Sequence, residues 1–227
     1  MESYLTLSGE GVSEVLIKGS RFLGWAGPAA DPEDAAAAVD RARSRWPHAN
    51  HHAYAYRLRD GDGRIRYRSS DDGEPGGTAG RPLYRALDGP GICNAAVVTS
   101  RIFGGIKLGA GGLARAYGRA AREAVDAAGR VLLPVLEDYR LVIPAIRLGI
   151  VEAFLQRGAM TIEDRRVEGE DVALGLRLQD SKARELAAWL AGATGGTARL
   201  MHRGAAGRSH EKPRSYENRS DGLGPIP

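Results

Sequence analysis

The chain has 227 residues, with 32 Lys or Arg against 28 Asp or Glu, which gives a net charge of +4. This length suits one large or two small domains that need no disulfide or structural metal. The single cysteine, Cys93, excludes an internal disulfide, and no Cys/His spacing typical of zinc sites occurs. Neither a signal-peptide pattern nor an apolar run of membrane-spanning length is present, so we expect a soluble protein that is not exported. The lone cysteine suits the reducing cytoplasm, and no cofactor is expected.

The first elements in chain order are strands and one helix. Residues 15–26 mix β-branched and apolar residues around a Gly-Ser break, which predicts a hairpin or a bent pair of strands. Asp31 is a typical N-cap and Pro32 suits the first helical position, so a helix should run from there to about Arg45.

A β-hairpin follows over residues 53–70, because two alternating segments are separated by Gly-Asp-Gly. In its second strand, side chains at alternate positions point to opposite faces, so Ile65 and Tyr67 should share one face. The opposite face is either solvated or binds a polyanion through its arginines, Arg64, Arg66 and Arg68.

The loop RSSDDGEPGGTAG, residues 68–80, which we call the acidic loop, combines turn residues with three carboxylates. These carboxylates could hold a hydrated Mg²⁺ or act as general acid and base, with His51 as a further candidate. They could equally pair with arginines or cap a turn. The acidic candidates are Asp71, Asp72 and Glu74. The histidines His48, His51 and His52 give little support to a zinc site. Those at the start of the strand point to opposite faces, and no further ligand set is present.

A short helix is expected at 81–89 and a strand at 92–103. A second glycine-rich stretch, FGGIKLGAGG at 103–112, which we call the glycine loop, joins this strand to a helix expected over 113–129. It fits neither the P-loop nor the dinucleotide-binding pattern. Backbone N–H groups at the start of a helix can still bind an anion, or the glycines simply permit a tight connection. The glycines are Gly104, Gly105, Gly109, Gly111 and Gly112, and the nearby cations are Lys107, Arg101 and Arg115.

The remaining pattern predicts strand, helix, two strands, helix and strand, which is a ferredoxin-like arrangement. We therefore expect an α+β protein with an N-terminal domain over 1–135 that is an α/β sandwich, and a ferredoxin-like domain over 136–202. Residues 203–227 contain almost no aliphatic side chains, so a disordered basic tail is expected there.

Charge is distributed unevenly along the sequence. Residues 41–122 carry an excess of nine positive charges, whereas residues 1–40 carry an excess of five negative charges. The basic middle of the chain indicates a polyanion partner such as RNA, or a phosphate-bearing ligand, if the arginines gather on one face. The alternative is that these arginines are merely solvated.

Two long motifs, SSDDGEPGGTAGRPLYRAL and NAAVVTSRIFGGIKLGAGGLARAYGRAA, together with ANHHAYAYR at 49–57, resemble the IMPACT/YigZ family. The resemblance implies an N-terminal domain similar to the second domain of small-subunit ribosomal protein five. It also implies a C-terminal domain similar to the last domain of elongation factor G. Eukaryotic relatives regulate translation with the help of an added N-terminal domain, which we do not expect here.

The resulting hypothesis is a cytoplasmic RNA- or ribosome-associated regulator of translation or stress response. Phosphates would be bound by the glycine loop and by basic residues: Lys107, Arg101, Arg115, Arg64, Arg66, Arg68 and Arg81. One rival is an enzyme acting on a phosphate ester or nucleotide through Asp71, Asp72, Glu74 and His51. Another is a protein-binding adaptor that pairs through a sheet edge of the ferredoxin-like domain.

Overall fold

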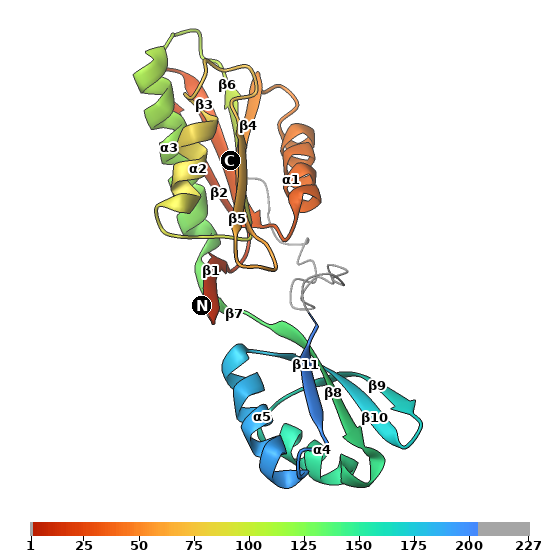
Figure 1. Cartoon of the computed structure of the whole chain (residues 1–227). Helices are drawn as coiled ribbons and strands as arrows, with labels where there is room; N and C mark the ends of the chain where they lie inside the picture. Colours follow the sequence, from red (N-terminus) through yellow and green to blue (C-terminus); the bar gives the residue numbers. More distant parts are fainter. Residues whose placement is uncertain (1, 204–227) are drawn as a thin grey trace.

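A five-stranded antiparallel sheet forms the centre of the N-terminal unit, in the order β2-β3-β6-β4-β5 (Figure 1). The structure is a computed structural model and describes residues 2–203. The central strand β6 is buried on both faces, as its apolar sequence predicts. The strands are β2 (Gly11–Ile17), β3 (Ser20–Pro28), β4 (His51–Arg59), β5 (Ile65–Ser70) and β6 (Ala95–Ile102).

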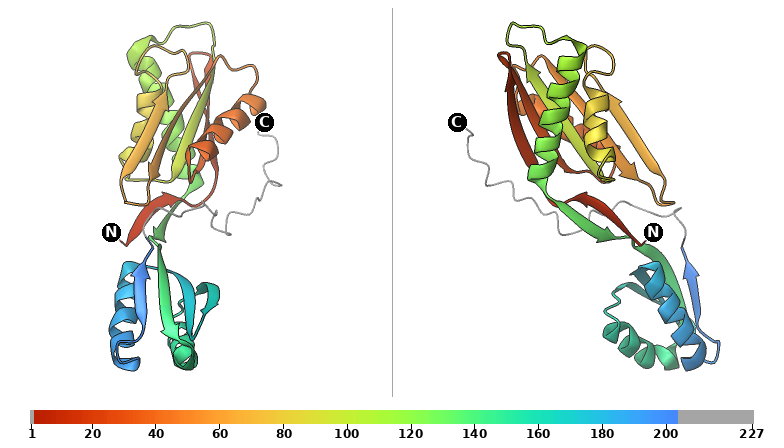
Figure 2. Two further views of the ribbon diagram at one scale, coloured as in Figure 1. Left: turned by 45° about the vertical axis from the view of Figure 1, so that its right-hand side comes forward. Right: turned by 90° about the vertical axis from the view of Figure 1, so that its left-hand side faces the viewer.

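Helices cover both faces of this sheet. Helix α1 (Pro32–Arg45) packs on one face, and helices α2 (Gly80–Asp88) and α3 (Gly109–Ala128) pack side by side on the other (Figure 2). The predicted start of α1 is confirmed, because the Asp31 carboxylate accepts a hydrogen bond of 2.7 Å from the backbone N–H of Asp34. Each face has its own apolar core, so the sheet is sandwiched between two helical layers.

Helix α3 begins four residues earlier than the periodic pattern predicts. Gly109, Gly111 and Gly112 therefore lie in its first turn and not in the preceding loop. Glycine has a low helix propensity, which hides such a turn from a pattern-based prediction. The N–H groups of a first turn lack intrahelical partners in any case, so an irregular start costs little. Of the helices that the structure describes, α3 included, none is long and apolar enough to cross a membrane.

The C-terminal unit has the predicted order of elements, β-α-β-β-α-β. Its antiparallel sheet runs in the order β11-β8-β10-β9, and helices α4 and α5 cover one face around a separate apolar core. The elements are β8 (Glu137–Pro144), α4 (Leu148–Arg157), β9 (Ile162–Glu168), β10 (Asp171–Leu178), α5 (Asp180–Ala193) and β11 (Arg199–His202). Apart from Arg203, the tail expected to be disordered lies outside the described residues.

A two-stranded ribbon that the sequence did not predict lies between the two units (Figures 1 and 2). Strand β1 (Ser3–Leu7) pairs antiparallel with β7 (Arg130–Pro134), which follows α3. Each strand has only five residues, and the two strands are separated by more than a hundred residues of sequence. No local pattern therefore marks the pairing. The expected boundary between residues 135 and 136 falls between β7 and β8.

Candidate functional site

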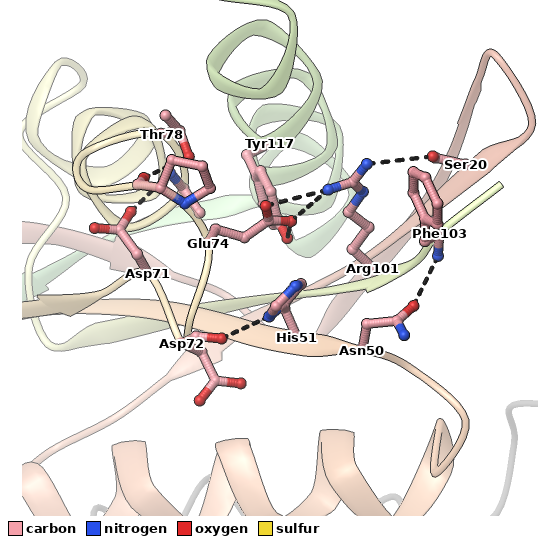
Figure 3. Close-up of polar contacts among 12 residues, drawn as sticks. Ser20, Asn50, His51, Asp71, Asp72, Glu74, Thr78, Arg101, Phe103 and Tyr117 are labelled. Atoms are coloured by element: carbon pink, nitrogen blue, oxygen red, sulfur yellow. Dashed lines mark hydrogen bonds and ion pairs between the residues drawn. The ribbon is translucent and has the colours of Figure 1, made fainter. Parts of the chain in front are cut away.

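The acidic loop meets the elements on both sides of the glycine loop through one buried carboxylate. Glu74 is 8% exposed and accepts hydrogen bonds of 2.8 and 3.1 Å from Nη1 of Arg101, which is 6% exposed (Figure 3). The Tyr117 hydroxyl donates a further bond of 2.8 Å to Glu74. Arg101 belongs to β6 and Tyr117 to α3, so Glu74 joins the strand before the glycine loop to the helix after it.

The Arg101 guanidinium is enclosed as well as paired. Its charge lies 5.5 Å from the ring centre of Phe22 and 5.2 Å from that of Phe103, which is a cation–π distance. Burial, reinforced by the Glu74 carboxylate, raises the pKa of Tyr117, so its hydroxyl stays protonated as a donor. Arg101 was expected to contact phosphate, but in this position it holds the Glu74 loop in place and is not presented to a ligand.

Asp71 caps helix α2 from nine residues away. Its Oδ1 accepts hydrogen bonds of 2.8 Å from the backbone N–H groups of Ala79 and Gly80, and its Oδ2 accepts one from Gly77. No side chain at the N-cap position itself bonds the first turn of α2. Burial opposes ionisation of Asp71, but the three N–H bonds outweigh it and hold the pKa of this carboxyl below its usual range.

This capping predicts a pH dependence. Because the folded pKa is lowered, the stabilisation is complete above the unfolded value of about 4 and is lost as the pH falls through the folded pKa. We expect Asp71→Asn to cost about 1–2 kcal/mol of unfolding free energy at pH 7 and to flatten the decline below pH 4. Urea unfolding at several pH values measures both effects. The exposed Asp62→Asn is the control, and equal behaviour of the two variants would contradict the capping role.

Asp72 positions the two histidines at the start of β4. Its carbonyl oxygen lies 2.7 Å from Nδ1 of His51, and its carboxylate accepts a bond of 2.6 Å from the backbone N–H of His52. A carbonyl oxygen only accepts hydrogen bonds, so Nδ1 of His51 carries the proton. The carboxylate also lies 3.5 Å from Arg43 of α1.

The His52 ring faces the other side of the sheet, where it bonds Ser100 at 2.7 Å. Burial lowers the pKa of His52, and this outweighs the opposing effect of the Asp72 carboxylate. His48 is exposed, and within residues 2–203 no three Asp, Glu, His or Cys side chains are grouped as metal ligands. His51 and the three carboxylates of the acidic loop thus lie in one region, but each of these carboxylates accepts hydrogen bonds from other groups of the protein.

The glycine loop is fastened at its start and exposed beyond it. The N–H of Phe103 donates to Asn50, and the N–H of Gly104 donates to the buried Ser20 hydroxyl at the β2–β3 turn. Gly104 is required there, because a Cβ would lie 1.9 Å from the carbonyl carbon of Gly19. The loop then continues exposed through Lys107 to the first turn of α3, which has no side-chain cap.

Five exposed cations lie on α2, on α3 or in the loop that leads into α3. We call these the helix-side basic surface, and within the described chain none has an ion pair or side-chain hydrogen bond: Arg81, Arg85, Lys107, Arg115 and Arg122. The sequence-based prediction named three of them and missed Arg85 and Arg122. Their spacing carried the signal, because Arg85 lies four residues after Arg81 and Arg122 lies seven after Arg115, which places each pair on one helix face.

The arginines of the hairpin lie on the opposite side of the sheet from α2 and α3. Arg66 and Arg68 are paired in register with Leu58 and Tyr56, which pack in the core beneath α1. Tyr67 is therefore on the α2 side, and the predicted alternation of the two faces is confirmed. Arg66 lies 3.4 Å from Asp60, and Arg64 precedes the strand. The predicted cations thus divide between two faces and do not form one patch.

The geometry defines a class of two-unit α+β protein in which a buried Glu-Arg-Tyr cluster connects an acidic loop to the strand and the helix that flank a glycine loop. Comparison with known proteins agrees, since the Impact N-terminal domain family matches residues 18–125. An IMPACT family member of Thermus thermophilus is 41% identical over 163 residues, which cover 72% of this chain and 86% of that protein. The Escherichia coli member YigZ is 33% identical over 205 residues, which cover 88% and 98%.

A solved structure gives the same result for the fold. A crystal structure described as that of a hypothetical protein superposes with a TM-score of 0.70 at 33% identity. The match covers 88% of this chain and 97% of that one. The chain belongs to the IMPACT family.

Proposed function

We propose that this protein binds RNA, free or within the ribosome, through the helix-side basic surface, and thereby acts in the control of translation. The supporting observation is that five exposed cations without acidic partners lie on the two helices that cover one side of the sheet, or in the loop that leads into α3. A cation that is not paired within the protein neutralises a phosphate without first losing another partner. The acidic side chains of α2 and α3 are already paired: Asp88 with Arg57, Glu123 with Arg119 and Asp126 with Arg130.

The start of α3 adds to this surface. Its first-turn N–H groups have no side-chain acceptor, and the positive end of the helix dipole favours an anion there. Lys107 lies in the exposed loop just before this turn, and Arg115 lies one turn beyond it. The Arg115 Nη1 lies 3.6 Å from the position of a Cβ at Gly111, so its side chain extends back toward the helix start.

In this proposal the buried cluster has a supporting role. Glu74 and Arg101 fix β6 and α3 on either side of the glycine loop, and Asp71 fixes the start of α2. Both helices that carry the cations are thereby held in a defined position. The proposal assigns no catalytic step to Asp71, Asp72, Glu74 or His51.

A salt titration of RNA binding tests the proposal. Each neutralised phosphate adds about 0.7–0.9 to the slope of log K against log salt concentration. We expect Arg115→Ala/Arg122→Ala to reduce this slope by about 1.4–1.8 and to weaken binding at fixed salt. Fluorescence anisotropy with a labelled RNA, at several KCl concentrations, gives the slope.

The chain offers a control with the same change of charge on the other face. Arg66→Ala/Arg68→Ala removes two cations from the α1 side and is expected to leave the slope near that of the parent protein. If this control flattens the slope and the helix variant does not, the α1 side is the RNA-binding face. If neither RNA nor ribosomes bind near physiological salt, the proposed function is wrong.

A further inference from the structure

An exposed pair of aromatic rings lies on the α2 side of the edge strand β5. Tyr67 is 61% exposed, although its ring packs on that of Tyr84 in α2. The ring centres are 4.5 Å apart and the planes are inclined by 32°. The Tyr84 ring thus covers part of the Tyr67 ring, and the rest of Tyr67 remains accessible to solvent.

The supporting ring is held in place by polar contacts. The Tyr84 hydroxyl donates a bond of 2.9 Å to Asp88, four residues later in the same helix. Asp88 also lies 3.3 Å from Arg57 of β4, whose Nη1 donates to the carbonyl of Ile92. Tyr84 is therefore anchored at both its ring and its hydroxyl. The surface on which Tyr67 packs is thus already fixed before a flat group binds, which lowers the entropy cost of binding.

The pair adjoins the helix-side basic surface. Helix α2 lies between β5 and α3 (Figures 1 and 2). Two of its exposed residues are Arg81 and Arg85. At its border with α3, a Cβ at Gly118 would lie 3.5 Å from Pro82 and 3.1 Å from the Arg122 guanidinium. The contacts of Tyr84 with Tyr67, and of Pro82 with the Gly118 position, thus connect the exposed ring through α2 to the part of α3 that carries Arg122.

We propose that Tyr67 stacks on an unpaired base of a single-stranded RNA whose phosphates lie along the helix-side basic surface. The inference rests on the proposed function and adds to it the class of RNA. A row of cations beside an exposed aromatic ring suits a single strand, because phosphates and base faces are both accessible. In a duplex the base faces are stacked inside the helix and cannot reach the ring.

Three probes test the proposal on the full chain. These are a labelled single-stranded RNA of about 12 nucleotides, the same strand annealed to its complement, and an abasic strand with equal phosphates. We expect the parent protein to bind the single strand about tenfold more tightly than the abasic strand. Tyr67→Leu should remove this preference and keep the salt slope, whereas Tyr67→Phe should retain it because the ring remains.

The outcomes separate this inference from the proposed function. If the parent protein binds the abasic strand or the duplex as tightly as the single strand, with a steep salt slope, stacking is overturned and the basic surface stands. If none of the three probes binds, the stacking inference is overturned, and binding of ribosomes then decides the proposed function separately. The comparison of probes on the parent protein needs no variant, so a folding defect in Tyr67→Leu would not obscure the result.

Discussion

Glu74→Gln is expected to lower the free energy of unfolding by about 3–5 kcal/mol, because it leaves the Arg101 charge buried without a counter-ion. Both side chains are almost inaccessible, so water cannot replace the missing carboxylate. Glutamine keeps nearly the same volume, which limits the effect to charge and hydrogen bonding. Chemical denaturation monitored by tryptophan fluorescence measures the loss.

An exposed pair provides the control for this change. Glu123→Gln breaks the pair with Arg119 in α3, one turn apart on the helix surface, and should change stability by no more than about 0.5 kcal/mol. The double variant Glu74→Gln/Arg101→Met should lose less than the sum of the single variants, since no buried charge is left unpaired. A loss below about 1 kcal/mol for Glu74→Gln alone would show that solvent reaches Arg101.

Gly104→Ala is expected to cost about 3 kcal/mol or more, because the added methyl group has no space. Its carbon would lie 1.9 Å from the carbonyl carbon of Gly19, 2.1 Å from the carbonyl oxygen and 2.3 Å from the Ser20 nitrogen. These are backbone atoms, so no side-chain rotation relieves the clash. The β2–β3 turn and the glycine loop must separate, which also breaks the bond from Gly104 to Ser20. Unfolding by urea measures the cost.

Gly111→Ala is the matched control in the first turn of α3. Only the flexible Arg115 guanidinium lies near the new methyl group, at 3.6 Å, and alanine favours the helix more than glycine does. Its stability should be unchanged or higher by up to about 1 kcal/mol. Comparable losses in both variants would mean that the region tolerates no added methyl group, and that the contact at Gly104 is not special.

Much of the fold follows from sequence because its signals are local. Asp31 with Pro32 marks the start of α1, and the alternation around Arg66 and Tyr67 gives both the hairpin and its two faces. The ribbon of β1 and β7 was missed for the opposite reason, since its hydrogen bonds connect distant segments. The start of α3 was missed because its glycines resemble a loop.

The candidate site was predictable in composition but not in connectivity. The sequence named the acidic loop and the glycine loop as candidates and left open whether they meet. In the structure Glu74 of the acidic loop bonds Arg101 and Tyr117, which lie before and after the glycine loop. The sequence did not indicate which carboxylate turns inward, because Asp71, Asp72 and Glu74 all suit a turn. Arg101 lies on a strand whose apolar sequence predicts burial on both faces, which implies that its side chain is enclosed. Such burial is not compatible with the phosphate contact also proposed for Arg101.

The ribbon of β1 and β7 affects how the two units can move. Only β7 continues along the chain into the C-terminal unit, and β1 reinforces it through five residue pairs in register. Glu2, next to β1, accepts bonds from the Gln179 side chain and the Ser181 N–H, at the start of α5. A group fused ahead of Ser3 would therefore emerge at the joint between the units, where an affinity tag is poorly placed.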